Sequence, residues 1–138
     1  LISIDHEIDI IYISNHGGRQ LDFGLGTTEV LTEIINTTKD HCEIYVDGGF
    51  YRGTDILKAI CLGATAIGLG RLYGYGMAAD GVDGIIRVLE ILEEEIINAM
   101  ANLGVTTLSE LNKDLICKSE PVVEPTAFSA FLPVKISH

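Results

Sequence analysis

The stretch that decides the fold prediction is IDIIYI, residues 8–13, followed directly by SNHGGRQLD, residues 14–22. A mostly apolar run rich in isoleucine is typical of a strand buried in a parallel sheet. His16 and Arg19 then follow the carboxyl end of that strand, and in α/β proteins this edge of the sheet binds ligands. A neutral imidazole accepts a proton near pH 7, and a planar guanidinium holds a carboxylate through two parallel hydrogen bonds. The stretch therefore predicts a ligand site, with an ordinary polar surface loop as the alternative.

Helices and strands alternate along the next part of the chain. We predict a helix at 27–39 with Thr27 as its N-cap, a strand at 43–46, a helix at 55–62 between Thr54 as N-cap and Gly63, and a strand at 64–69. Short connections between such units imply a parallel sheet with right-handed crossovers. The residues alone fit either a slice of a barrel or a small open sheet.

The pattern changes after Gly81, where apolar residues recur at helical spacing and predict a helix of about 20 residues ending near Gly104. We assign the acidic run 93–95 within it to a solvated face and not to a metal site. A capping-box pattern at 107–110 predicts a short helix reaching about Cys117. We therefore divide the chain into a folded part, 1–117, and an extended tail, 118–138.

Composition limits the classes of partner. The 138 residues carry a formal net charge of −11, which argues against binding to nucleic acid or to an anionic membrane surface. No apolar run approaches the roughly 20 residues of a membrane span. Three cysteines without paired spacing indicate reduced, mostly buried thiols, and we expect a cytoplasmic protein. Because the sequence opens without methionine and almost inside a strand, we expect it to begin within a longer protein.

Two further motifs follow the second and third predicted strands. These are Asp47-Gly48-Gly49 and Gly70-Arg71. In barrels, backbone N–H groups after late strands, a helix N-terminus and an arginine together bind phosphate. An Asp-Gly-Gly alone is an ordinary tight turn. Spaced one β/α unit apart and downstream of the His16 loop, the two motifs predict a phosphate site.

These motifs carry a resemblance. Residues 14–22 resemble, without a break, the signature of the FMN-dependent α-hydroxy-acid oxidases and dehydrogenases, and residues 47–55 are similar to a second motif of that family. Residues 56–71 are similar to the segment leading into its last strand, so the resemblance covers roughly residues 8–116. It implies that the three strands are the last three of a TIM (β/α)8 barrel, and that the cofactor is FMN.

The resemblance also implies residue roles. His16 resembles the catalytic base that takes a proton from a 2-hydroxy acid such as lactate or glycolate, giving a 2-oxo acid, and Arg19 resembles the ligand of the substrate carboxylate. The cofactor-binding positions that it implies are Asp47, Gly48, Gly49, Tyr51, Gly70 and Arg71. A homo-oligomer, tetrameric or larger, is the implied assembly.

The sequence also departs from the family pattern. Tyr51 stands where an arginine of the flavin-phosphate segment is usual, Leu72 replaces a usual proline, and Glu7 and Ile10 stand where glycines are common. The first five strands have no counterpart here. Three strands cannot close a barrel, so we expect this chain to need the missing N-terminal half and to be inactive alone.

Two alternatives stay open. One is a non-catalytic remnant or assembly fragment of the family, which Tyr51 and the missing half favour. The other is a different phosphate-binding barrel, such as an FMN-dependent isomerase. The loop from His16 to Arg19 favours hydroxy-acid chemistry, because it sets a base beside a carboxylate-binding arginine.

Overall fold

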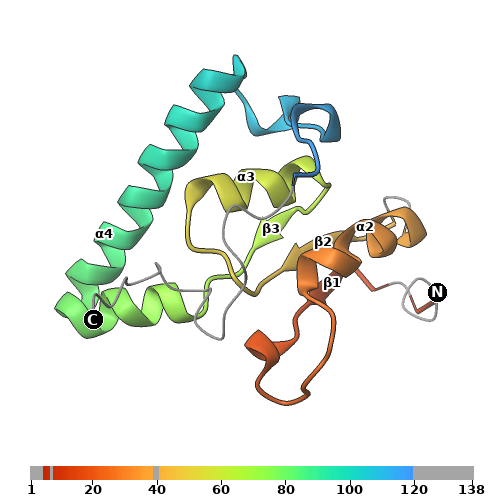
Figure 1. The fold of residues 1–138 in the computed structure, drawn as a ribbon, viewed down its shortest axis with the longest axis horizontal. Coiled ribbons are helices and arrows are strands. Elements are labelled where there is room, and N and C mark those ends of the chain that lie inside the picture. Colours follow the sequence, from red (N-terminus) through yellow and green to blue (C-terminus); the bar gives the residue numbers. More distant parts are fainter. Residues whose placement is uncertain (1–4, 7, 39–40, 120–138) are drawn as a thin grey trace, which may run out of the picture.

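A three-stranded parallel sheet forms the centre of the computed structural model, which describes residues 5–6, 8–38 and 41–119. The strands are β1 (Ile10–Ile13), β2 (Glu43–Val46) and β3 (Ala66–Ile67), in the spatial order β1-β2-β3 (Figure 1). Ile13 pairs with Val46, and Val46 with Ile67. Backbone bonds from Thr65 to Ile44 and from Gly68 to Val46 continue the pairing beyond β3. The three predicted strands are confirmed, with shorter bounds at β1 and β3.

Two helices connect the strands, α2 (Thr27–Thr38) and α3 (Gly53–Cys61). Both helices were predicted, but α3 begins earlier than expected and Thr54 is not its N-cap. Arg52 takes that position, because the Asp55 carboxylate accepts hydrogen bonds from the backbone N–H groups of Tyr51 and Arg52. That carboxylate fixes the turn before the helix, so the chain becomes helical at Gly53.

The main core lies between the sheet and these two helices. Ile13, Ile44 and Val46 of the strands are buried against Leu31 of α2 and Ala59 of α3. Side chains alternate along a strand, so Tyr12 and Tyr45 project from the other face of the sheet. Their rings meet edge to face with centroids 6.3 Å apart. Both helices therefore cover one face of the sheet, as right-handed crossovers between successive strands require.

The last long element, α4 (Arg71–Leu103), consists of two straight segments joined at a sharp bend (Figure 1). Asp80 and Gly81 leave the helical region there, with φ −155° and +53°. A Cβ atom at Gly76 would lie 2.7 Å from the Gly84 carbonyl oxygen, so glycine allows the two segments to cross closely. The predicted helix between Gly81 and Gly104 is confirmed as the second segment. The first was not predicted, because its glycines are poor helix formers.

The prediction of an α-helix after residue 107 is wrong, because this segment forms 3₁₀ turns instead. Two 3₁₀ turns stand there, η2 (Leu108–Glu110) and η3 (Lys113–Leu115). The capping box is confirmed, since the Glu110 carboxylate accepts from the Thr107 N–H at 2.9 Å. Leu111 then turns extended and packs with Leu57 and Met100 in a second small core, which ends the turn early. Residues 120–138 of the predicted tail lie outside the described residues.

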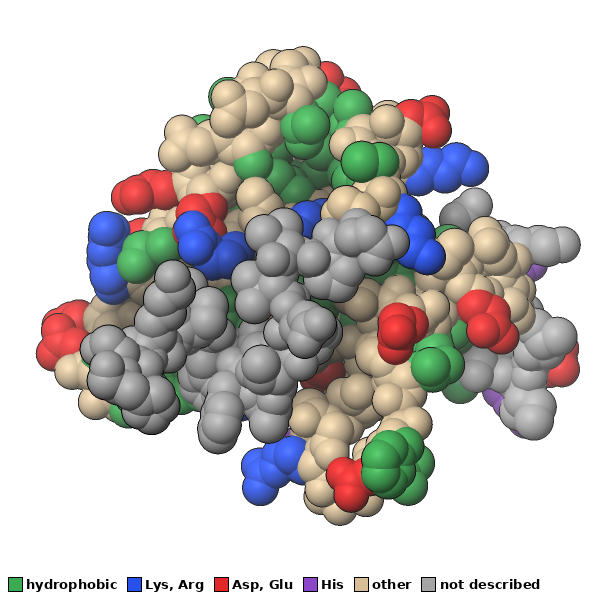
Figure 2. Space-filling model, in the orientation of Figure 1, with side chains coloured by type: hydrophobic (Ala, Val, Ile, Leu, Met, Phe, Trp, Pro, Cys, Tyr) green, Lys and Arg blue, Asp and Glu red, His purple; other side chains and the backbone are tan. Residues whose placement is uncertain are grey.

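Surface features follow from this arrangement. On the face in Figure 2, apolar side chains reach the surface between acidic and basic ones. Within the described ranges, no helix has the length and apolar character to cross a bilayer, and no group of His, Cys, Asp and Glu side chains is arranged to hold a metal ion. All three cysteines are free thiols, but only Cys61 is buried, so the expectation of mostly buried cysteines is wrong for the exposed Cys117.

Candidate functional site

A cavity of about 400 Å³ opens at the carboxyl ends of the three strands. It is lined by the loop after β1, the turn after β2 and the segment that leads from β3 into α4. All eight sequence-predicted site residues line it: His16, Arg19, Asp47, Gly48, Gly49, Tyr51, Gly70 and Arg71. The structure adds Gly17, Phe50, Gly68, Leu72, Tyr73 and Gly74. Residues 72–74 escaped prediction because the helical segment that carries them was not expected.

The loop after β1 holds His16 in an unusual backbone conformation. The φ angles of His16, Gly17 and Gly18 are 55°, 67° and 75°, and such a left-handed run is uncommon for a residue with a side chain. Ser14 Oγ accepts from the His16 N–H at 3.1 Å, and Asn15 Oδ1 accepts from the Gly17 N–H at 3.0 Å. Two side chains thus fix the turn that presents the exposed imidazole at the cavity.

The turn after β2 is fixed from α2. Thr27 was predicted as an N-cap, but it is the first residue of α2, and its hydroxyl donates to the Asp47 carbonyl oxygen. Gly48 has a φ of 97°, and a Cβ atom there would lie 3.0 Å from the Thr27 hydroxyl oxygen. Glycine is therefore required at this position both by the backbone and by the close approach of α2.

Asp47 brings a buried acceptor to the cavity. Its Oδ1 atom is buried, and no residue in the described part of the chain donates a hydrogen bond to it. Burial and the nearby Asp47 carboxylate raise the pKa of the Tyr12 phenol. Tyr12 also explains why position 68 is a glycine, because a Cβ atom there would collide with the Tyr12 hydroxyl. Tyr12 was not among the predicted site residues. The signal that could have identified it is a lone tyrosine within a strand that is otherwise rich in isoleucine.

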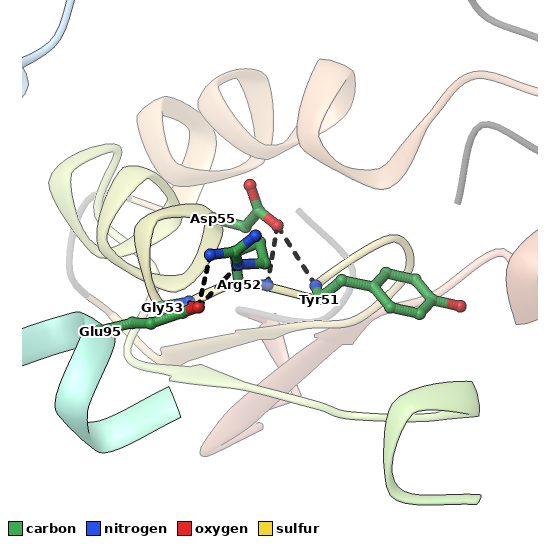
Figure 3. Close-up of polar contacts among 5 residues, drawn as sticks. All are labelled: Tyr51, Arg52, Gly53, Asp55 and Glu95. Carbon is green, nitrogen blue, oxygen red and sulfur yellow. Dashed lines mark hydrogen bonds and ion pairs between the residues drawn. The ribbon is translucent and has the colours of Figure 1, made fainter. Parts of the chain in front are cut away.

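The N-terminus of α3 is already occupied by carboxylates of the chain (Figure 3). Glu95 of α4 accepts from the Gly53 N–H at 2.6 Å and from the Arg52 guanidinium at 2.7 Å. The hydrogen bond from Arg52 lowers the pKa of Glu95 most. The assignment of 93–95 to a solvated face is therefore wrong for Glu95, which contacts α3. These contacts pair Arg52 and the first N–H group of α3 with a carboxylate of the chain itself.

The N-terminus of α4, in contrast, opens into the cavity. Gly70 precedes the helix and supplies no side-chain hydrogen bond, and Arg71, Leu72 and Tyr73 of the first turn line the cavity. The first N–H groups of a helix lack partners within it, and they carry the positive end of its dipole. This end of the cavity suits an anion, because Arg71 adds a positive charge to the lining that carries these N–H groups.

Tyr51 contacts that guanidinium. The Cζ atom of Arg71 lies 6.0 Å from the centroid of the Tyr51 ring. Burial raises the pKa of Tyr51, while Arg71 lowers it and Tyr75 raises it. Arg71 also reaches toward the loop of His16, because a Cβ atom at Gly17 would lie 3.8 Å from its Nη2 atom. The anion end and the imidazole loop therefore belong to one cavity.

Comparison with known proteins gives one family. The family model described as FMN-dependent dehydrogenase matches residues 1–118. The chain is 48% identical over 111 residues to L-lactate dehydrogenase (cytochrome) of Saccharomyces cerevisiae, covering 77% of this chain and 19% of that protein. It is 42% identical over 115 residues to human 2-hydroxyacid oxidase 2, covering 83% of this chain and 33% of that protein.

Solved structures agree with these matches. A flavocytochrome b2 with pyruvate bound superposes with a TM-score of 0.82 at 40% identity, over 92% of this chain and 34% of that one. Mandelate oxidase with benzoyl-formic acid gives 0.78 at 40% identity, over 81% and 33%. The chain thus spans about a third or less of the length of these relatives.

Proposed function

This chain belongs to the FMN-dependent dehydrogenase family, and we propose that it forms part of an enzyme that oxidises a 2-hydroxy acid to a 2-oxo acid. FMN is the cofactor that this membership indicates. The observation that carries the proposal is that an imidazole, two guanidiniums and a glycine-rich anion end line one cavity. The relatives named for lactate and for 2-hydroxy acids support the substrate class.

The residues of the cavity fit FMN. Glycines at 48, 49 and 70 let a flat or extended ligand approach the backbone closely. Arg71 and the open N-terminus of α4 suit the phosphate. The buried Oδ1 atom of Asp47 is an acceptor for a hydroxyl group, and the ribityl chain of FMN carries hydroxyls. When bound, FMN supplies a two-electron acceptor.

Two side chains act on the substrate in this proposal. Arg19 binds the carboxylate through two parallel hydrogen bonds, which orients the hydroxyl-bearing carbon. His16, three residues earlier, accepts a proton from the hydroxy acid. Converting a 2-hydroxy acid to a 2-oxo acid removes two electrons and two protons, so a base beside the substrate is required for one of the protons. Hydrogen bonds to the side chains of Ser14 and Asn15 fix the backbone turn from which the imidazole extends.

We propose further that the three strands are the last three of a (β/α)8 barrel. Successive parallel strands with both connecting helices on one face are the arrangement of such a barrel. The chain covers 34% of the flavocytochrome b2 chain on which it superposes, and the uncovered part is long enough for five further units. Those units, and a homo-oligomer of the complete enzyme, are part of the proposal.

The test is anaerobic mixing of the intact protein, loaded with FMN, with lactate, glycolate and mandelate. We expect the flavin absorbance to bleach with at least one of them and the matching 2-oxo acid to form in equal amount. A protein that binds FMN but is reduced by none of these acids would support the non-catalytic alternative. Turnover of a substrate without net flavin reduction would support an isomerase.

A further inference from the structure

The contact between Tyr51 and Arg71 has a consequence for how a phosphate is held. Tyr51 follows the Asp47–Gly49 turn, and Arg71 opens α4, so the contact joins two loops of the cavity. The Tyr51 ring projects away from the Arg52–Glu95 pair (Figure 3). Adjacent residues thus have separate tasks, since Arg52 binds Glu95 while Tyr51 faces the cavity.

Arg71 differs from Arg52 in what surrounds it. No carboxylate within the described ranges lies at ion-pair distance from Arg71, whereas Arg52 and Arg87 both have glutamate partners. A carboxylate partner occupies guanidinium N–H groups and cancels their charge. An aromatic face instead orients the guanidinium plane and leaves its N–H edges free to donate.

We propose that Tyr51 is a positioning residue that holds the Arg71 guanidinium in place for the phosphate of FMN. The inference rests on the proposed function. Tyr75, four residues after Arg71 on the first segment of α4, lies on the same side of that helix. The Tyr51 hydroxyl is buried, and Tyr75 raises the pKa of Tyr51.

The test compares FMN with riboflavin, which lacks the phosphate. Each flavin is titrated into the flavin-free intact protein, and binding is followed by quenching of flavin fluorescence. Replacing Tyr51→Leu removes the ring, and we expect it to weaken FMN binding about two- to fivefold, the size of an exposed cation–π contact. Riboflavin binding should change by less than about twofold. Tyr51→Phe keeps the ring and should restore most of the preference for FMN.

A role limited to stability predicts equal losses for both flavins, and that result would overturn the inference. The ratio of the two affinities is measured on one preparation, so partial misfolding cancels. In an Arg71→Met background, Tyr51→Leu should leave the ratio unchanged, because no guanidinium remains to be held. The matched control is Arg52→Gln, which should leave the ratio at the parent value.

Failure of this inference and failure of the proposed function give different results. A parent protein that binds neither flavin overturns both. A parent protein that binds FMN more tightly than riboflavin, together with an unchanged ratio in Tyr51→Leu, overturns the positioning role alone.

Discussion

Glu95 is the residue whose replacement best tests how the two helices around the cavity are held together. Its side chain is 22% exposed, and its two oxygens accept from the Gly53 N–H at 2.6 Å and from Arg52 at 2.7 Å. Glu95→Ala removes both contacts at once. It leaves Gly53, a buried residue in the first turn of α3, with an N–H that has no partner within the helix.

The amide contact should dominate the cost of this change. The Arg52 side chain is 62% exposed, so water and salt screen the ion pair and it adds little. A donor left unpaired in a partly buried position costs about 1–3 kcal/mol. We therefore expect Glu95→Ala to lower the free energy of unfolding by about 1–3 kcal/mol. Glu95→Gln keeps an acceptor oxygen and should cost about 1 kcal/mol or less.

The assay is urea unfolding of the intact, flavin-free protein, followed by far-ultraviolet circular dichroism at low and at high salt. Arg52→Gln is the control, because it removes the ion pair and keeps the Gly53 contact. The expected order of cost is Glu95→Ala, then Glu95→Gln, then Arg52→Gln, with little dependence on salt. If Arg52→Gln costs as much as Glu95→Ala, or if high salt abolishes the cost, the ion pair dominates and the reasoning is wrong.

The same carboxylate gives a pH dependence. The hydrogen bond from Arg52 holds the pKa of Glu95 below its ordinary value of 4.5 in the folded protein. The unfolded chain therefore binds the proton at a higher pH than the folded one. The stabilisation is complete above pH 4.5 and is lost as the pH falls through the lower, folded value. The difference between the parent and Glu95→Gln should stay constant above this window and shrink within it.

Three further substitutions test the roles of two site residues and the packing of α3 against α4. His16→Gln should slow flavin reduction by roughly 10²–10⁴-fold with FMN still bound, measured by stopped-flow bleaching per bound flavin, and a near-parent rate would exclude His16 as the base. Arg19→Lys keeps the charge but loses the bidentate geometry, so kcat/KM should fall; a value within about twofold of the parent would contradict the carboxylate role. Gly53→Ala should destabilise the protein by about 1–3 kcal/mol in thermal unfolding, because its Cβ atom would lie 2.8 Å from the Ile96 backbone nitrogen and 2.9 Å from the Leu92 carbonyl oxygen. An unchanged midpoint would mean that α3 and α4 separate without cost.

The sequence predicted the order of the three strands and their two connecting helices, and it predicted eight of the residues that line the cavity. Apolar runs, helical spacing and glycine-containing loops are local signals, and they placed three strands and the two connecting helices. Parallel strands bring their carboxyl ends to one edge of a sheet. That rule alone was enough to gather His16, Asp47 and Arg71 into one cavity, although they are far apart in the chain.

Only the tertiary structure decided which partner each of two adjacent side chains contacts. Tyr51 and Arg52 are adjacent in sequence, yet one contacts Arg71 at the cavity and the other binds Glu95, 43 residues away. The bend at Gly81 makes this possible, because it brings the second segment of α4 back against the start of α3. A charge pairs with whichever opposite charge the fold brings within a few ångströms, and sequence spacing does not encode that distance.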